Sequence, residues 1–326
     1  MSFKKNLPGI SVAIITGLAA LFLSEHYGAP AMLFALLLGI AMSFLYQETP
    51  CREGIEFTSN FILRVGVALL GLRLAFNDLI GLGWEIIVAL LVAIMSTIFL
   101  GILLSRKLGF SKSFGALTGG SVAICGASAA MAITAILPDN KNKERDTLLT
   151  VIGVTSMSTI AMVVYPILAV YFGLDETQSG LFLGGTIHDV AQVVGAGYSV
   201  SEHTGDISTL VKLVRVSMLM PVALVMLFVI KHFNNSHSQQ TNTAKVPLFL
   251  VIFIVLMVIN SCFNLPEYII NTSISFSRFA LVTAIAAIGM KSNFSKLKSV
   301  GFKPILLMLV ETIWIAAFIL AVISFS

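Results

Sequence analysis

Charged side chains are scarce in this sequence: Asp, Glu, Lys and Arg make up 11% of it, whereas hydrophobic residues make up 57%. A soluble domain usually carries about a quarter charged residues. This chain therefore lacks the polar groups that would cover a surface exposed to water, and it has no long polar segment that could form a soluble domain. The composition predicts an all-α polytopic membrane protein whose single transmembrane domain covers 1–326.

Cysteines are few, and catalytic motifs are lacking. The three cysteines are odd in number and lie in or beside apolar segments, so they imply no disulfide framework. An HExxH pair, a P-loop, paired aspartates for diphosphate chemistry and a serine elbow are all missing. Their absence argues against an integral-membrane enzyme and against an ATP-driven pump formed by this chain alone. We expect no metal site and no cofactor.

Basic residues are too few to form a nucleic-acid surface. The net charge is +4, and the Lys and Arg residues form short clusters between apolar runs, as expected if they set the topology in a lipid bilayer. The chain is therefore not expected to bind nucleic acid.

Apolar runs long enough to cross a bilayer, about 20 residues each, are abundant. Uninterrupted spans are predicted near 8–24, 29–46, 57–76, 84–104, 147–172, 210–231, 246–263, 268–290 and 302–324. Two further segments, 113–137 and 179–199, are apolar but interrupted by glycine. If both cross the membrane, the chain has eleven spans. The first run is interpreted as a span and not as a signal peptide, because no convincing cleavage site follows it.

The basic clusters give an orientation. With eleven crossings, one side of the membrane receives Lys4/Lys5, Arg52, Arg106/Lys107/Lys112, Lys231/Lys245 and Lys291/Lys296/Lys298/Lys303. The mixed segment "DNKNKERD" (139–146) is expected on the other side, where its acids offset its bases. The positive-inside rule then places the N-terminus in the cytoplasm and the C-terminus outside.

An internal repeat is predicted from two loops. "GLRLAFNDLIGLGW" (71–84) aligns without gaps with "GMKSNFSKLKSVGF" (289–302). The first loop is expected outside and the second in the cytoplasm, so one unit occurs twice with opposite orientation, as in inverted-repeat secondary transporters. The repeat-like halves cover about 8–137 and 179–326, and the span 147–172 joins them.

The two interrupted segments share a pattern. "GGSVAICGASAA" (119–130) and "GGTIHDVAQVVGAG" (184–197) each begin with a glycine doublet and a hydroxyl residue. The doublets either let helices pack closely or break two helices that meet at mid-membrane, where freed backbone groups bind a solute. The second interpretation is favoured. It predicts a substrate site formed by Gly119, Gly120, Ser121, Cys125, Gly126, Ser128, Gly184, Gly185, Thr186 and Gln192.

Ionisable residues within spans are costly and usually functional. Arg64 either attracts an anion, since guanidinium matches an oxyanion, or pairs with an acid on another helix such as Glu311. His188 and Asp189 follow the second doublet and are the candidates for ion coupling. They form a proton site or a sodium site, or they only cap the broken helix.

Two further pairs of basic residues lie within or at the ends of predicted spans. Lys212 and Arg215 share a helix face near the outer end of their span, on the side that basic residues usually avoid. We expect them at the external mouth of an anion path. Arg73 and Lys291 occupy equivalent positions in the repeat and are expected to mark the ends of spans.

Three motifs resemble those of a known family. "GGSVAICGASAAMAI", "GGTIHDVAQVVGAGYSVSEHTGD" and "LVKLVRVSMLMP", in this order, are similar to the bacterial sulfate exporter (PSE) family, a group of conserved hypothetical membrane proteins. The resemblance covers essentially the whole chain. It implies a secondary transporter of the bacterial inner membrane, related to bile acid symporters and sodium/proton antiporters, with crossing broken helices and a sulfur oxyanion as substrate.

Together these observations predict a function. We expect a secondary active transporter of a small anion, sulfate or sulfite by resemblance, that works by alternating access and is coupled to protons or sodium. The alternatives are an anion channel and a sodium-coupled transporter of an organic anion. Transporters of this design are often dimers, so a homodimer is a further expectation, although the sequence identifies no interface.

Overall fold

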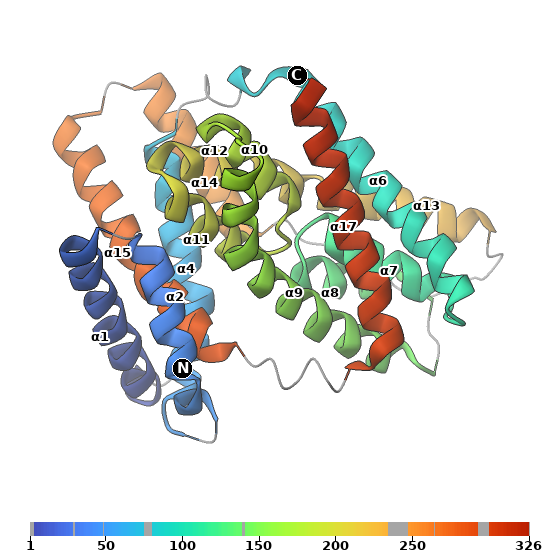
Figure 1. The fold of residues 1–326 in the computed structure, drawn as a ribbon, viewed down its shortest axis with the longest axis horizontal. Helices are drawn as coiled ribbons and strands as arrows, with labels where there is room; N and C mark the ends of the chain where they lie inside the picture. The colour runs from blue at the N-terminus through green and yellow to red at the C-terminus, as the bar shows by residue number, and fades with distance from the viewer. Residues whose placement is uncertain are drawn as a thin grey trace.

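The computed structural model describes residues 3–28, 30–47, 49–74, 80–138, 141–233, 247–263, 265–292 and 300–325. These residues form helices and connecting turns, without a strand (Figure 1). Within these described ranges, seven helices are long and apolar enough to cross a membrane. Exposed apolar side chains such as Phe22, Phe99 and Val170 cover their outer surfaces, where lipid would solvate them. The expectation of an all-α polytopic membrane protein is confirmed.

The helices pack into two groups. The first, called the α15 group, contains α1 (Phe3–Tyr27), α2 (Ala31–Ala41), η1 (Ser43–Tyr46), the continuous rod of α3 (Arg52–Phe57), η2 (Thr58–Ile62), α4 (Leu63–Leu69) and η3 (Leu70–Leu72), α14 (Leu248–Cys262) and α15 (Glu267–Lys291). The second, called the hairpin group, contains α6 (Gly83–Lys107), α7 (Lys112–Ala123), α8 (Ala127–Ile136), α9 (Lys143–Tyr171), α10 (Glu176–Thr186), α11 (Val190–Val200), α12 (Glu202–Ser217), α13 (Leu219–Phe233) and α17 (Phe302–Phe325). Between the groups, α11 packs against α2 and α15.

The first glycine segment folds back on itself. Phe110 and Ser111, before α7, line the same small hollow as Pro138 and Arg145, which follow α8. The chain therefore enters and leaves at one end of the bundle. We call α7 and α8 hairpin 1 and the residues between them, 124–126, its tip; Figure 1 shows the two helices side by side.

The second glycine segment folds back in the same way. Thr204, at the start of α12, donates a hydrogen bond of 2.9 Å to the carbonyl oxygen of Glu176, at the start of α10. The Thr177 hydroxyl lies 3.0 Å from Nε2 of His203, just beyond the end of α11. We call α10 and α11 hairpin 2, and residues 187–189 form its tip.

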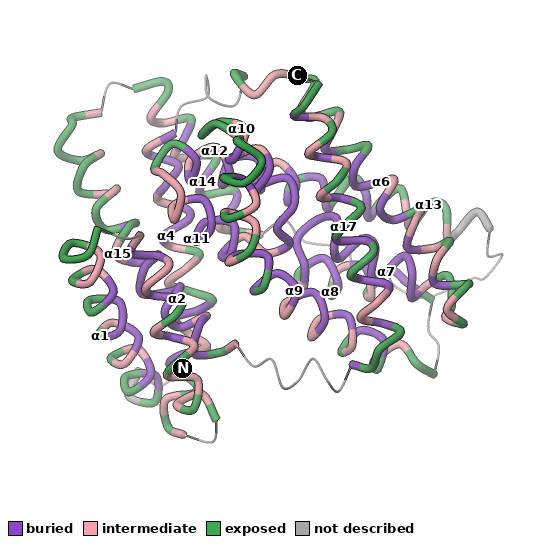
Figure 2. The backbone as a smooth tube through the Cα atoms, viewed as in Figure 1, coloured by how far each residue is buried: buried purple, intermediate pink, exposed green. Residues whose placement is uncertain are grey.

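The two hairpins approach each other from opposite ends of the bundle. The long helix α9 connects the end of hairpin 1 to the start of hairpin 2, so it separates their bases by the full length of the bundle. Their tips meet: a Cβ atom on Gly126 would lie 3.6 Å from the carbonyl oxygen of His188. Figure 2 shows that the chain is most buried in and around these hairpins.

This arrangement corrects two expectations. Neither glycine segment traverses the bundle, because each returns to the end at which it entered. The described part of "DNKNKERD", 141–146, consequently lies beside Gly109 and Ser111, on the side of the basic clusters and not opposite to it. The segments do meet at their breaks, as expected, although as two hairpins and not as two crossing helices.

The glycine doublets are also not the breaks. Gly119 lies inside α7, where a Cβ atom would come within 2.8 Å of the carbonyl oxygen of Thr97 on α6. Gly184 lies inside α10, where a Cβ atom would clash with the carbonyl oxygen of Ser208 on α12. The doublets therefore allow close helix packing, which was the less favoured interpretation, and the helices end only at Ala123 and Thr186.

The predicted repeat has a partial counterpart in the packing. The rod that precedes the first repeat loop packs against α15, which precedes the second, and α6 packs against α17. The central residues of both loops, 75–79 and 293–299, lie outside the described residues. The inverted repeat therefore stays a prediction.

Candidate functional site

Two buried basic side chains hold the hairpin tips together. Lys212 and Arg215 project from α12, and both are 0% exposed. The Lys212 ammonium donates hydrogen bonds to the carbonyl oxygens of Ile124, at 2.7 Å, and Ile187, at 2.9 Å. One lysine thus joins the tip of hairpin 1 to the tip of hairpin 2.

Arg215 makes the same connection with more bonds. Its guanidinium donates to the carbonyl oxygens of Val122 and Ala123 on hairpin 1 and of Gly184 and Ile187 on hairpin 2. These carbonyls belong to the C-terminal ends of α7 and α10, which lack intrahelical donors and carry partial negative charge. A cation therefore satisfies both helix ends.

The positions of these residues correct their expected role. Lys212 and Arg215 were expected at an external mouth, but they are enclosed and directed at backbone carbonyls. Their separation of three residues does place them on one helix face, and that face meets the tips. They contact the carbonyls of the tips and do not line the cavity described below.

Beyond the breaks, the two hairpins begin their second helices differently. Gly126 precedes α8 with a φ of +63°, and no side chain caps that helix. Asp189 precedes α11, and its carboxylate accepts a hydrogen bond of 2.8 Å from the backbone N–H of Ala191. The N-terminus of α8 therefore keeps its partial positive charge, whereas a carboxylate faces the N-terminus of α11.

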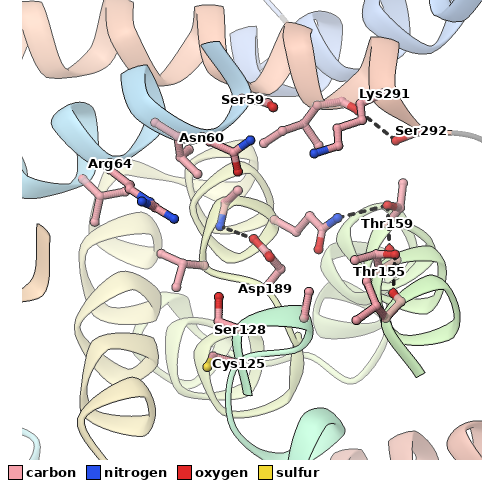
Figure 3. Close-up of a pocket in the computed structure, with 18 of the residues that line it drawn as sticks. Ser59, Asn60, Arg64, Cys125, Ser128, Thr155, Thr159, Asp189, Lys291 and Ser292 are labelled. Atoms are coloured by element: carbon pink, nitrogen blue, oxygen red, sulfur yellow. Dashed lines mark hydrogen bonds between the residues drawn. The ribbon is translucent and has the colours of Figure 1, made fainter. Parts of the chain in front are cut away.

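A cavity of about 410 Å³ lies between the tips and the α15 group. Figure 3 shows Asn60, Arg64 and Lys291 on one wall, and Ser128 and Asp189 on the opposite wall. The first three side chains come from the rod and α15, whereas Ser128 comes from the first turn of α8 and Asp189 from the tip of hairpin 2. Residues of α9, including Thr155 and Thr159, form a third wall. The cavity is thus built from both helix groups.

The charges in the cavity face one another without pairing. Arg64 and Lys291 form no ion pair within the described residues, and the only partner of the Asp189 carboxylate there is the N–H of Ala191. The suggested pair of Arg64 with Glu311 is not formed, because Glu311 is buried and accepts a hydrogen bond of 2.8 Å from the Thr118 hydroxyl. The cavity wall therefore carries two cations and one acid.

The structure divides the predicted site residues into two sets. Those that line the cavity are Arg64, Cys125, Ser128, Asp189 and Gln192. The others do not line the cavity, and instead pack or hydrogen-bond within the hairpins or against neighbouring helices: Gly119, Gly120, Ser121, Gly126, Gly184, Gly185, Thr186, His188, Lys212 and Arg215.

His188 and Asp189 are separated by this division although they are neighbours. The His188 side chain is fully buried, and its Nε2 lies 3.0 Å from the hydroxyl of Thr312 on α17. It fastens hairpin 2 to that helix. Asp189 instead faces the cavity.

Several lining residues were missed from the sequence. Lys291 was expected only to mark a span end, and the hydroxyls of Thr155 and Thr159 were not considered. Asn60, which was also missed, and the two threonines had a signal: Asn60 precedes Arg64, and Thr155 precedes Thr159, by one helical turn, which puts each pair on one face of an apolar helix. Polar pairs with this spacing inside a span deserve the same weight as a single charge.

Tyr46 borders the cavity at its α15-group end. Its hydroxyl donates a hydrogen bond of 2.7 Å to the Glu56 carboxylate. Burial, together with this bond, raises the pKa of Tyr46 to about 12. The tyrosine therefore remains a neutral hydrogen-bond donor at any physiological pH.

Comparisons with known proteins agree with the membrane assignment. The chain is 47% identical to the UPF0324 membrane protein CT0845 of Chlorobaculum tepidum over 98% of this chain and 89% of the relative. It is 47% identical to the UPF0324 membrane protein TauZ of Paracoccus denitrificans, over 96% and 93%. It is 30% identical to the UPF0324 inner membrane protein YeiH of Escherichia coli, over 95% and 91%. No solved structure matches the chain.

The family assignment follows from these relatives and from a family model. The model described as "Conserved hypothetical protein 698" matches residues 8–308, which include both hairpins, α12 and the cavity. With matches of this extent, the chain belongs to the Conserved hypothetical protein 698 (UPF0324) family of membrane proteins.

Proposed function

We propose that this protein is a secondary transporter that carries a small anion across the bacterial inner membrane. The observation that carries the proposal is the cavity in which Arg64 and Lys291 face the uncapped N-terminus of α8. Guanidinium, ammonium and a helix N-terminus are the groups that bind oxyanions most readily in proteins. Sulfate and sulfite are the first candidates, by the sequence resemblance.

Paired hairpins that enter from opposite ends suit alternating access. Their backbone breaks are sheltered from lipid within the protein, which is the only place where a membrane tolerates them. The anion site lies between the two helix groups, so sliding or rocking of one group against the other would expose it to each side in turn. Arg73 bonds to Glu202 and Asp206 at one end of this boundary, at 2.9 and 2.8 Å.

The proposed topology has nine crossings and two re-entrant hairpins. The crossings are α1, α2, the rod from Arg52 to Leu72, α6, α9, α12 with α13, α14, α15 and α17. This count keeps the termini on opposite sides and moves Lys141, Lys143 and Arg145 to the cytoplasmic side, in better agreement with the positive-inside rule. Lys245, Lys296 and Lys298, used for the same rule, lie outside the described residues.

Coupling to a proton or to sodium is assigned to Asp189. It is the one of the two predicted coupling residues that faces the cavity. A cation bound there would neutralise the carboxylate and favour the arrival of an anion nearby. Coupling of this kind distinguishes a transporter from a channel, which only dissipates gradients.

Reconstitution in liposomes tests the proposal. Uptake of radiolabelled sulfate and sulfite is followed with and without imposed proton and sodium gradients, for the wild type, Arg64→Ala and Arg278→Ala. Arg278 is a matched control: it is an arginine of α15 that lies outside the cavity, and its one ion pair among the described residues, with Glu202, is long at 3.7 Å.

We expect gradient-driven accumulation that Arg64→Ala lowers at least about tenfold, the worth of one charge-assisted hydrogen bond, and that Arg278→Ala preserves. An internal anion concentration that never rises above the electrochemical equilibrium of the anion would identify a channel. Equal loss in both variants would remove Arg64 from the site. No flux of any anion by folded protein would refute the proposed function.

A further inference from the structure

We propose that the preferred ligand of this cavity is a zwitterion: a small organic acid, sulfonate or carboxylate, that also carries an ammonium group. The inference rests on the proposed function and specifies its substrate class. It comes from the way in which the charges of the cavity are divided between its walls.

Opposite charges line opposite walls and stay apart. Arg64 and Lys291 come from the α15 group, and Asp189 comes from the tip of hairpin 2. Within the described residues none of the three pairs with another. Side chains that are long and mobile, as Arg and Lys are, would close a simple salt bridge if they could reach. A ligand with charges of both signs would satisfy both walls at once.

The wall with Asp189 has a second acceptor. Gln192 is three residues further along α11, and its Nε2 donates a hydrogen bond of 3.0 Å to the Thr159 hydroxyl. That hydroxyl gives its only proton to the carbonyl oxygen of Thr155, at 2.9 Å, so it can only accept from Gln192. The amide orientation is therefore fixed, with Oε1 as the free end.

Oε1 of Gln192 is buried and has no hydrogen-bond partner within the described residues. Gln192 lines the cavity together with Asp189, so this oxygen is an unsatisfied acceptor in the wall that holds the Asp189 carboxylate. Two acceptors without a donor between them suit an ammonium group, which has only donors to offer. A bare oxyanion would leave both unsatisfied, at a cost to its binding.

The wall of Arg64 and Lys291 offers charged donors to an acid, because neither side chain has an acceptor partner within the described residues. From the Asp189 side, the uncapped N-terminus of α8 presents Ser128 toward the same cavity. The cavity volume of about 410 Å³ lies within the range of about 300–1,000 Å³ typical of sites for organic ligands. A sulfate ion alone would leave much of it to water.

Binding of matched ligands to the full-length protein in detergent tests the inference. The probes are 2-aminoethanesulfonate against ethanesulfonate and 3-aminopropanoate against propanoate, measured by calorimetry in sodium-free and in sodium-containing buffer. The proteins are the wild type, Asp189→Asn and Asp175→Asn. Asn is as good a helix cap as Asp, so Asp189→Asn keeps the tip folded. Asp175 is a matched control because it caps α10 of the same hairpin outside the cavity.

We expect the wild type and Asp175→Asn to bind at least one amino compound about tenfold or more tightly than its partner without nitrogen, as one charge-assisted bond implies. Asp189→Asn should bind both members of the pair alike. Equal affinities in the wild type, or a preference that survives Asp189→Asn, would overturn the inference while leaving an anion transporter. The inference would also be overturned if sodium alone raised the affinity for the amine-free ligand to that for its amino counterpart. Failure of all four probes and of sulfate would instead refute the proposed function.

Discussion

The tips of the two hairpins are built alike up to their breaks and differently beyond them. In both, a glycine doublet packs a first helix closely, and the carbonyls that end this helix accept hydrogen bonds from Lys212 and Arg215. Beyond the break, hairpin 1 continues with Gly126 and an uncapped α8, whereas hairpin 2 continues with Asp189 and a capped α11.

The comparison shows how one backbone design can present opposite charges. An uncapped helix N-terminus acts as roughly half a positive charge, and a capping carboxylate turns the same position into a net negative one. Two hairpins that meet at one cavity can therefore attract an acidic and a basic group to adjacent places. The shared part of the design holds the tips together, and the residue after each break sets the chemistry.

The largest expected effect comes from the shared part. Arg215→Leu removes the guanidinium that bonds to Val122, Ala123, Gly184 and Ile187. The carbonyls that lose their donor remain buried, and each buried acceptor left without a hydrogen bond costs about 1–3 kcal/mol. The unfolding midpoint in detergent, followed by heating or denaturant, should fall accordingly, and transport should be lost.

Lys212→Met should cost less, since it removes only the two bonds of Lys212, to Ile124 and Ile187, and keeps those of Arg215. Arg278→Leu on α15 controls for loss of a partly exposed arginine and should change the midpoint little. Equal stability of Arg215→Leu and wild type would mean that the tips do not depend on this side chain.

The second-largest effect is expected from a substitution that makes the start of α8 in hairpin 1 resemble that of α11 in hairpin 2. Ser128→Asp places a carboxylate in the first turn of α8, facing the cavity. The acid is compatible with a helix N-terminus, so stability should hold, but like charges opposite an anionic ligand cost several kcal/mol. Anion affinity, measured by calorimetry, should fall about 100-fold.

Ser128→Ala is its control and should lose no more than the hydroxyl contact, about tenfold or less. If Ser128→Asp bound anions as well as Ser128→Ala does, the N-terminus of α8 would not be part of the anion site.

Sequence reasoning located the two interrupted segments, but neither the residues at which their helices end nor the direction in which the chain continues. A segment of apolar and small residues has the same composition whether it crosses the membrane or turns back. The turn at the tip of hairpin 1 depends on Lys212 and Arg215, whose contacts to Ile124 and Ala123 join residues far apart in the chain. Such contacts leave no mark in hydropathy.

In the site, too, the features visible in local sequence were predicted, and those that depend on contacts between distant helices were not. Arg64 and Asp189 stood out because a charge inside an apolar span is costly wherever it lies. The role of the doublets depends on Thr97 and Ser208, which belong to other helices. Because these partners are distant in the chain, the local sequence around a doublet is equally compatible with a helix break and with close helix packing.

A smaller effect concerns the backbone of hairpin 1. Gly126 has a φ of +63°, which L-residues rarely adopt, and a Cβ atom there would meet nothing closer than 3.6 Å. Gly126→Ala therefore adds strain without a clash, and should lower the free energy of unfolding by about 1–3 kcal/mol. Gly173→Ala, in the loop before α10, tests another glycine of positive φ, +69°, outside the site. A midpoint unchanged by Gly126→Ala would indicate that the tip relaxes freely.

The smallest effect is the cap of hairpin 2, and it separates structure from charge. Asp189→Ala removes the acceptor for the Ala191 N–H, so it should cost about 1 kcal/mol in denaturant unfolding. Asp189→Asn keeps the cap and should cost close to nothing. If both variants nevertheless lose the same ligand preference, the carboxylate acts through its charge on the ligand. If Asp189→Asn keeps that preference and only Asp189→Ala loses it, Asp189 is a structural cap, and the two tips differ in stability alone.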